Sequence, residues 1–174
     1  MDTAFNSAHE LKCELASEVL RSSGSLRLRV TGWSMLPTVW PGDTLVIDRI
    51  PSEDVFSGDI VLFGRDRRLF AHRVVTRGAV TKGKAQNAEI LTRGDAMPAP
   101  DPPVPESDLL GKVSFILRNG KCIEPSRRLC LWQRTLATVL RRSTFAARIV
   151  VGIHGLLQTS QSQSQDQLSQ VQTL

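Results

Sequence analysis

The sequence predicts a mainly β fold of the α+β class: a small, coiled antiparallel β-domain with a helix at each end. Short alternating apolar runs, separated by Gly, Pro and Asp, fill the middle of the chain, and helical spacing of apolar residues precedes and follows them. A chain of 174 residues that is 41% hydrophobic suffices for one compact domain with extensions. The predicted parts are an N-terminal amphipathic helix (1–25), the β-domain (26–125), a basic amphipathic helical extension (126–157) and a disordered tail (158–174).

The first element is a helix predicted over residues 8–22. Leu11, Leu15 and Val19 recur at helical spacing, with Ala16 and Leu20 beside them. A Ser-Ser-Gly-Ser run then ends the pattern. We expect one amphipathic helix that covers the β core. It is too short and solitary to form a helix-turn-helix module for DNA.

From residue 26 the spacing changes to period two, because Leu26, Leu28 and Val30 alternate with arginines. Asn119-Gly120 is typical of a tight hairpin turn. Asp43 and Asp59 each follow a glycine and are assigned to turns. The predicted strands are 26–30, 44–50, 59–63, 69–75, 89–92 and 112–117.

The C-terminal third is basic. Between residues 112 and 157 nine Lys or Arg residues face a single acid, Glu124. Apolar residues such as Trp132, Leu136 and Val139 fall on one helical face and arginines on another. Such a helix packs on the β-domain or lies on an anionic membrane through residues 129–157. Nucleic-acid binding is disfavoured, because the basic residues are not interleaved with aromatic ones.

The cysteine pattern and the apolar content of the chain indicate the cellular compartment. The three cysteines have no Cys-x-x-Cys spacing, which argues against a disulfide framework and a zinc ribbon and favours a reducing compartment. There is no signal-peptide core near the N-terminus and no apolar run long enough to cross a bilayer. We expect a cytoplasmic protein, with peripheral membrane attachment as an open alternative. The Gln/Ser tract at 158–174 has too little apolar surface to fold.

Four motifs carry the chemistry. Gly-Trp-Ser-Met-Leu-Pro-Thr at 32–38 places Ser34 between a strand and a Pro-bounded loop, where its hydroxyl would be presented. A serine hydroxyl is a weak nucleophile and needs a nearby base. The later motifs are Gly-Asp-Ile-Val-Leu-Phe at 58–63, Ala-His-Arg-Val-Val at 71–75, and Thr-Arg-Gly-Asp at 92–95 with Asp101 six residues beyond Asp95.

In this order the motifs resemble the boxes of the signal peptidase I family and of the related LexA-type self-cleaving repressors, over roughly residues 26–117. The resemblance implies a small β fold with Ser34 as nucleophile. Most members of that superfamily use a buried Lys as base, and the matching position here is His72. Imidazole titrates near neutrality and can serve as a general base. This arrangement resembles the endoplasmic-reticulum and archaeal branch, for which a Ser-His-Asp arrangement is inferred.

The resemblance also implies a carboxylate that orients the imidazole. Asp95 and Asp101 both match that branch, and the sequence favours Asp95 without deciding between them. Gly32 stands where signal peptidases usually have Ser, so the oxyanion donors would be backbone N–H groups, chiefly that of Ser34. Arg73, the next residue on the strand after His72, should point to the opposite face and have a structural role.

The resemblance further implies a peptide or protein substrate that adds itself as a strand beside the strands leading to Ser34 and carrying His72. Trp33 either walls a substrate pocket or covers the edge of the core. Met35 packs on the sheet or lines the groove. No cofactor is implied, and a metal site made by His72 and the two Asp residues is disfavoured because no dense ligand cluster surrounds them.

The sequence therefore predicts a serine endopeptidase that cleaves a leader-type or signal-type peptide, or a specific protein partner, through an acyl-enzyme. Two alternatives stay open. One is a non-catalytic peptide-binding relative of the same fold. The other is a LexA-like regulatory autoprotease, against which the missing DNA-binding domain and the missing Ala-Gly linker count.

Overall fold

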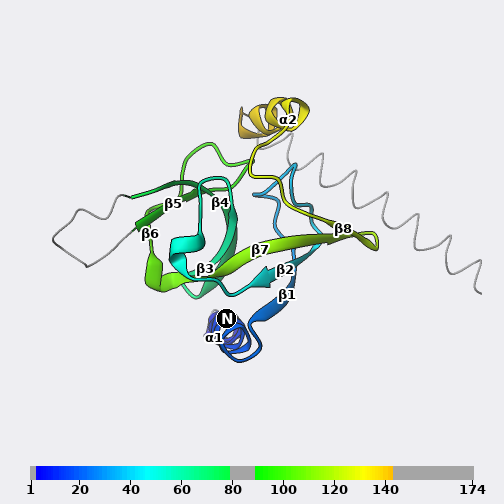
Figure 1. The fold of residues 1–174 in the computed structure, drawn as a ribbon. Coiled ribbons are helices and arrows are strands. Elements are labelled where there is room, and N and C mark those ends of the chain that lie inside the picture. The colour runs from blue at the N-terminus through cyan, green and yellow to red at the C-terminus, as the bar shows by residue number, and fades with distance from the viewer. Residues whose placement is uncertain (1–2, 79–88, 143–174) are drawn as a thin grey trace, which may run out of the picture.

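The fold was analysed in a computed structural model, which describes residues 3–78 and 89–142. Its centre is one eight-stranded sheet in which all paired strands are antiparallel. Helix α1 lies at one end of the sheet and helix α2 at the other (Figure 1). This arrangement confirms the predicted fold class.

The sheet follows the order β1-β2-β7-β3-β4-β5-β6, with β8 paired to β7 outside this path. The six predicted strands are present. The two extra strands, β6 and β8, are two and three residues long, which is too short for alternation to reveal them. The bounds are β1 Ser25–Arg29, β2 Thr44–Asp48, β3 Ile60–Arg65, β4 Arg68–Arg77, β5 Glu89–Arg93, β6 Val104–Pro105, β7 Leu109–Arg118 and β8 Lys121–Ile123. Short 3-10 turns occupy Ser52–Asp54 and Glu106–Asp108.

Strand β3 separates two apolar clusters. Its alternate side chains Ile60 and Leu62 enter one cluster with residues of β2 and β7, while Val61 and Phe63 enter the other with residues of β4 and β5. All four are almost completely buried. Each such side chain contributes roughly 1.5–3 kcal/mol by leaving water. The strands that carry the site are therefore fixed to a core on both faces of β3.

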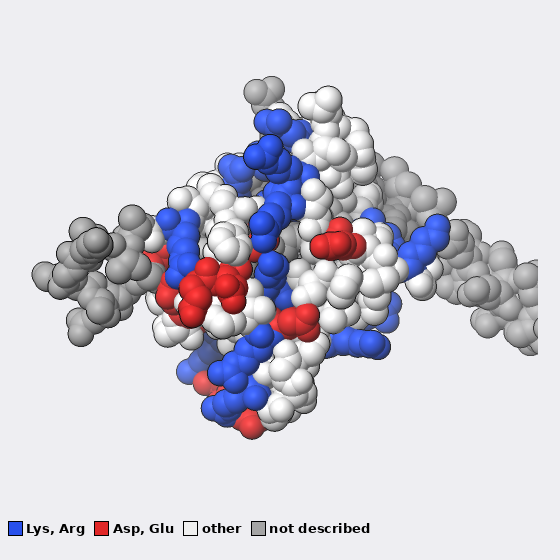
Figure 2. Space-filling model, viewed as in Figure 1, with Lys and Arg blue, Asp and Glu red and all other residues white. Residues whose placement is uncertain are grey.

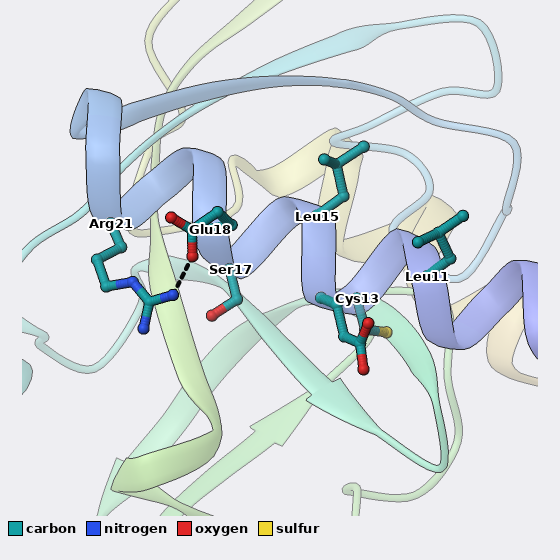
Figure 3. Close-up of a pocket in the computed structure, with 7 residues that line it drawn as sticks. Leu11, Cys13, Leu15, Ser17, Glu18 and Arg21 are labelled. Carbon is teal, nitrogen blue, oxygen red and sulfur yellow. Dashed lines mark hydrogen bonds and ion pairs between the residues drawn. The ribbon is translucent and has the colours of Figure 1, made fainter.

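The side of helix α1 (Thr3–Ser23) that packs on this core is not the side that carries its most regular apolar spacing. Ala16 and Leu20 are buried, whereas Leu11 and Leu15 are 63% and 60% exposed. Figure 3 places Leu11 and Leu15 on the same side of the helix. The prediction that this helix covers the core is confirmed for the side that carries Ala16 and Leu20, whereas Leu11 and Leu15 stay exposed, because successive helical residues are about 100° apart.

Helix α2 (Leu131–Arg142) covers the opposite end of the domain (Figure 1). Leu136 and Leu140 pack against Trp33 and Trp40 in a third apolar cluster. Trp132 is 59% exposed, although it falls on the predicted apolar face. The remainder of the predicted extension and the tail at 158–174 lie outside the described residues. Within the described part of the chain, no helix is long and apolar enough to cross a membrane.

Turns join the strands as the sequence indicates. Asn119 and Gly120 have φ angles of 49° and 74° in the β7–β8 hairpin, which suits the residues that tolerate left-handed backbone. The Asp43 carboxylate accepts the Trp40 N–H at 2.7 Å. Asp59 likewise accepts the Phe56 N–H at 3.0 Å. Both aspartates are therefore turn residues, as predicted.

Candidate active site

Three side chains form a continuous hydrogen-bonded chain. His72 Nε2 lies 2.9 Å from Ser34 Oγ, and His72 Nδ1 lies 2.7 Å from Asp101 Oδ2. With the ring proton on Nδ1, the imidazole donates to Asp101 and accepts from the Ser34 hydroxyl. That tautomer is the one that general-base catalysis requires. The sequence prediction of Ser34 and His72 as neighbours therefore agrees with the geometry.

Thr92 fixes Asp101 through both its side chain and its backbone. The Thr92 hydroxyl donates to Asp101 Oδ2 at 2.7 Å, and the Asp101 N–H donates to the Thr92 carbonyl at 2.8 Å. Arg65 also donates to the carbonyls of Pro102 and Pro103, which fixes the segment after Asp101. Burial alone would raise the pKa of Asp101, but hydrogen bonds from His72 and Thr92 hold that pKa below its usual value. The carboxylate is thus kept ionised beside the imidazole.

His72 comes from strand β4, where it pairs with Val61 of β3 and is only 4% exposed. The rings of Phe63 and Phe70 lie 6.1 and 5.9 Å from the imidazole, centroid to centroid. These apolar rings cover the imidazole. Among the described residues, its two nitrogens have hydrogen-bond partners only in Ser34 and Asp101. These two hydrogen bonds and two ring contacts fix the orientation of the imidazole.

Ser34 begins a tight turn after the strand region of β1. The Val39 N–H donates to the Met35 carbonyl, and the Ser34 carbonyl accepts the Ala96 N–H at 2.9 Å. Gly94 makes this approach possible: a Cβ at that position would lie 2.6 Å from the Ser34 carbonyl oxygen and 3.1 Å from Ser34 Cβ. The glycine of the Thr-Arg-Gly-Asp motif thus lets the nucleophile loop and the strand β5 end pack in contact.

The favoured prediction for the orienting carboxylate was wrong, because Asp95 does not contact His72. Its carboxylate receives Nε and a terminal nitrogen of Arg73, both at 2.8 Å, and the Thr38 hydroxyl at 2.5 Å. His72 and Arg73 are successive residues of one strand, so their side chains leave opposite faces. Asp95 lies on the Arg73 face and Asp101 on the His72 face. Arg73 therefore has the structural surroundings that the sequence predicted.

The Arg73–Asp95 pair ties several elements together. Arg73 also donates to the carbonyls of Gly58 and Ser126, at 2.7 and 2.8 Å. Arg141 of α2 donates to the backbone carbonyl of Asp95 at 2.9 Å. The pair is largely buried, with side-chain exposures of 11% for Arg73 and 3% for Asp95. This network holds the nucleophile loop, β4 and α2 in one arrangement.

Sequence reasoning assigned no role to Thr92, Thr38 or Arg141. Thr92 had a usable signal, since it stands two residues before Gly94 in the motif and on β5, next to the strand that carries His72. Thr38 also stands in a motif, the one at 32–38, but nothing there indicates its contact with Asp95 across a long stretch of chain. Arg141 had no signal, because it meets the site through the distant Asp95 carbonyl. Such contacts depend on tertiary structure alone.

A comparison with family models shows to which family the chain belongs. The family model described as Peptidase S24-like matches residues 2–96, which is more than half of the chain. The chain belongs to the Peptidase S24-like family. The matched residues of this S24-like chain include Ser34 and His72 and end before Asp101. At the level of the LexA and signal peptidase superfamily of serine peptidases, the match agrees with the resemblance of the motifs. Neither a curated protein nor a solved structure matches the chain significantly.

A groove in the S24-like domain leads to Ser34 and His72. It has a volume of about 670 Å³ and is lined by the end of β1, the first residues of β4 and part of α1. Met35 lines this groove and is also buried in the main core, so both roles considered for it are met. Trp33 does not line the groove. Its side chain packs on the α2 cluster, which favours the second of its two predicted roles, covering the edge of the core, over that of a substrate-binding residue.

The backbone next to Ser34 has a free donor. Among the described residues, the N–H of Ser34 makes no hydrogen bond to a protein acceptor. It is therefore available for an anionic oxygen near Ser34 Oγ. The described part of the chain holds no group of three or more His, Cys, Asp or Glu side chains that could bind a metal ion.

Proposed function

We propose that this S24-like protein is a serine endopeptidase in which Ser34 is the nucleophile, His72 the general base and Asp101 the residue that orients His72. The observation that carries the proposal is the 2.9 Å contact of Ser34 Oγ with His72 Nε2, continued by the 2.7 Å contact of His72 Nδ1 with Asp101. A base within hydrogen-bond reach is what a serine nucleophile needs.

In the first half-reaction, Ser34 Oγ attacks the carbonyl carbon of the scissile peptide bond while its proton moves to His72 Nε2. Asp101 stabilises the imidazolium that forms. His72 then gives this proton to the leaving amine, the C–N bond breaks, and an ester links the substrate to Ser34.

In the second half-reaction, water takes the position of the leaving amine. His72 removes a proton from this water as it attacks the ester carbonyl, and then returns the proton to Ser34 Oγ. The products are a carboxylic acid and the free enzyme. Both steps place negative charge on the carbonyl oxygen, and we assign the Ser34 N–H as the chief donor to it.

A histidine base with a carboxylate behind it supports membership of the endoplasmic-reticulum and archaeal branch of signal peptidases, which the motif at 92–95 also resembles. The substrate class proposed on this basis is a leader-type or signal-type peptide, or an exposed segment of a specific protein partner.

The substrate is proposed to bind as an added strand. In the described structure β1 pairs only with β2, and residues 68–72 of β4 pair only with β3, since β5 pairs with β4 from Arg73 onward. Both open strand edges line the groove. An extended peptide between them would use main-chain hydrogen bonds for affinity and side-chain pockets for selection.

The test is cleavage of a mixed peptide library by the purified full chain, read by mass spectrometry. The proposal expects new termini with the full chain and none with Ser34→Ala. Peptides that bind without being cut would instead support the non-catalytic relative. Cleavage confined to the protein's own chain and abolished by Ser34→Ala would support the LexA-like autoprotease.

Peripheral contact with an anionic membrane through residues 129–157 stays a prediction. Leu131, Trp132 and Val139 of α2 are 80%, 59% and 55% exposed, which supports it. Figure 2 shows Lys and Arg side chains in a broken column that descends from the region of α2 across the sheet.

A further inference from the structure

The substrate groove is lined by three cations and no acid. Lys12 comes from α1, Arg29 from β1 and Arg68 from the first position of β4. The three therefore line one groove from separate elements. The remaining lining residues are mainly apolar.

These cations lack the partners that neighbouring basic residues have. In the described residues, no carboxylate lies within ion-pair distance of Lys12, Arg29 or Arg68. By contrast, Arg67 is paired with Glu10 and Arg73 with Asp95. The groove consequently carries uncompensated positive charge, which a bound anionic group would neutralise.

The position of Arg68 sets the distance from the reaction centre. Arg68 and His72 are four residues apart on β4, so their Cα atoms are about 13 Å apart at a strand rise of about 3.3 Å per residue. A peptide added beside β4 has the same rise. Its side chain nearest Arg68 is thus about four positions from the scissile bond. Between the two lie apolar lining residues, among them Leu69 and Ala71.

We propose that the substrate is a peptide with acidic side chains three to five positions from the scissile bond and apolar side chains between them and that bond. This inference rests on the proposed function, because the groove is taken as the peptide site. Lys12, Arg29 and Arg68 are the residues that select the acidic positions. Complementary charge raises both the association rate and the selectivity of such a site, and salt weakens the effect.

The experiment measures peptide binding by full-chain Ser34→Ala, so that no probe is consumed. Three fluorescein-labelled peptides share an Ala/Leu centre of six residues and carry three acidic, three neutral or three basic residues at each end. Fluorescence anisotropy at about 50 mM salt should give a dissociation constant at least tenfold lower for the acidic peptide than for the neutral one. The basic peptide should bind most weakly.

Two double variants test whether the groove residues cause the preference for the acidic peptide. In the Ser34→Ala background, Lys12→Glu/Arg68→Glu should remove the tenfold preference for the acidic peptide. The matched control, Lys121→Glu/Arg128→Glu, makes the same change of net charge at exposed positions that do not line the groove, and should keep this preference. Circular dichroism checks that each variant is folded.

Equal affinity for the three peptides, or no binding of any of them, overturns this inference even if Ser34-dependent cleavage is found. A preference for the acidic peptide that the control variant also loses would overturn it too, because net charge would then explain the effect. If the acidic peptide binds selectively but the full chain cleaves no peptide, the inference stands as a binding specificity and the endopeptidase proposal fails.

Discussion

The two faces of strand β4 each hold one carboxylate from the same region of the chain. On one face His72 holds Asp101, whose side chain is 20% exposed, next to the groove. On the other face Arg73 holds Asp95, whose side chain is 3% exposed, inside a network of main-chain and side-chain contacts. Adjacent residues of one strand thus give two aspartates different roles: the Asp101 carboxylate serves the proposed chemistry, and the Asp95 carboxylate stabilises the scaffold.

The first prediction sets the catalytic face against the scaffold face. Asp101→Asn should lower kcat by about 10²–10⁴-fold, because the imidazole loses the group that fixes its tautomer and stabilises its charged form. Asp95→Asn should leave kcat of the folded protein within a few-fold of the original. Peptide cleavage kinetics with any substrate found in the library measure both. Equal losses would erase the distinction between the two faces.

The second prediction concerns stability, for which Asp95→Asn should have the larger effect of the two variants. Asp95→Asn leaves the buried Arg73 without its counter-charge, so the free energy of unfolding should fall by about 3–5 kcal/mol. Asp101→Asn should cost less, since its side chain is partly exposed. Urea unfolding followed by circular dichroism measures the difference. A larger loss for Asp101→Asn would contradict the scaffold role of Asp95.

The third prediction tests the contact between the two motifs. In Gly94→Ala the added methyl group would lie 2.6 Å from the Ser34 carbonyl oxygen, so the nucleophile loop must shift. A displacement of about 1 Å is expected to lower kcat by about 10²-fold. Gly64→Ala is the control, because a Cβ there meets nothing within 4 Å. Unchanged cleavage by Gly94→Ala would mean that the loop tolerates the shift.

The fourth prediction concerns pH. Asp101 and the turn residue Asp59 both have a lowered pKa in the folded protein: for each, burial opposes ionisation, but hydrogen bonds and nearby cations outweigh it. The unfolded chain binds their protons first on acidification. Their stabilisation is therefore present above the ordinary carboxyl pKa of about 4 and lost as pH falls through the lower folded value. Urea unfolding at pH 7, 5 and 3 should show this loss, and Asp59→Asn should make it smaller; an identical pH dependence would contradict the assignment.

The smallest expected effect concerns α2. Vesicles rich in phosphatidylserine should sediment a fraction of the protein, and Trp132→Ala should lower that fraction a few-fold because an exposed interfacial ring is removed. Neutral vesicles are the control. Equal sedimentation with both lipid compositions, or none with either, would contradict membrane contact through this helix.

Much of the site followed from local patterns. Strand alternation predicted that His72 and Arg73 point in opposite directions, and the resemblance of the motifs to the signal peptidase and LexA families implied that Ser34 and His72 are neighbours. The choice between Asp95 and Asp101 did not follow, because it depends on how the chain turns after β5 and on the Thr92–Asp101 hydrogen bonds.

The buried side of α1 and the place of Trp33 were also beyond local patterns. Leu11 and Leu15 have the same apolar character as Leu20, and only the docking angle of α1 decides which is covered. Trp33 packs on the side of the domain that α2 covers. This contact joins residues that are about a hundred positions apart in the sequence. Periodicity describes a face of one element and not its partner.

The Ser34–His72–Asp101 assignment can be tested without a substrate when a reporter thiol replaces the nucleophile. In Ser34→Cys, the new thiol becomes reactive at pH 6 only if His72 removes its proton. Alkylation by iodoacetamide, mapped by mass spectrometry, gives its rate against that of Cys13, whose pKa is raised by burial and by the charge of Glu10. We predict that alkylation at position 34 is at least about tenfold faster in Ser34→Cys than in Ser34→Cys/His72→Ala, given an ordinary thiol pKa of about 8.5. In the Ser34→Cys background, Asp101→Asn should lose this acceleration and Asp95→Asn should keep it. The same slow rate in all four proteins would contradict the Ser34–His72–Asp101 assignment.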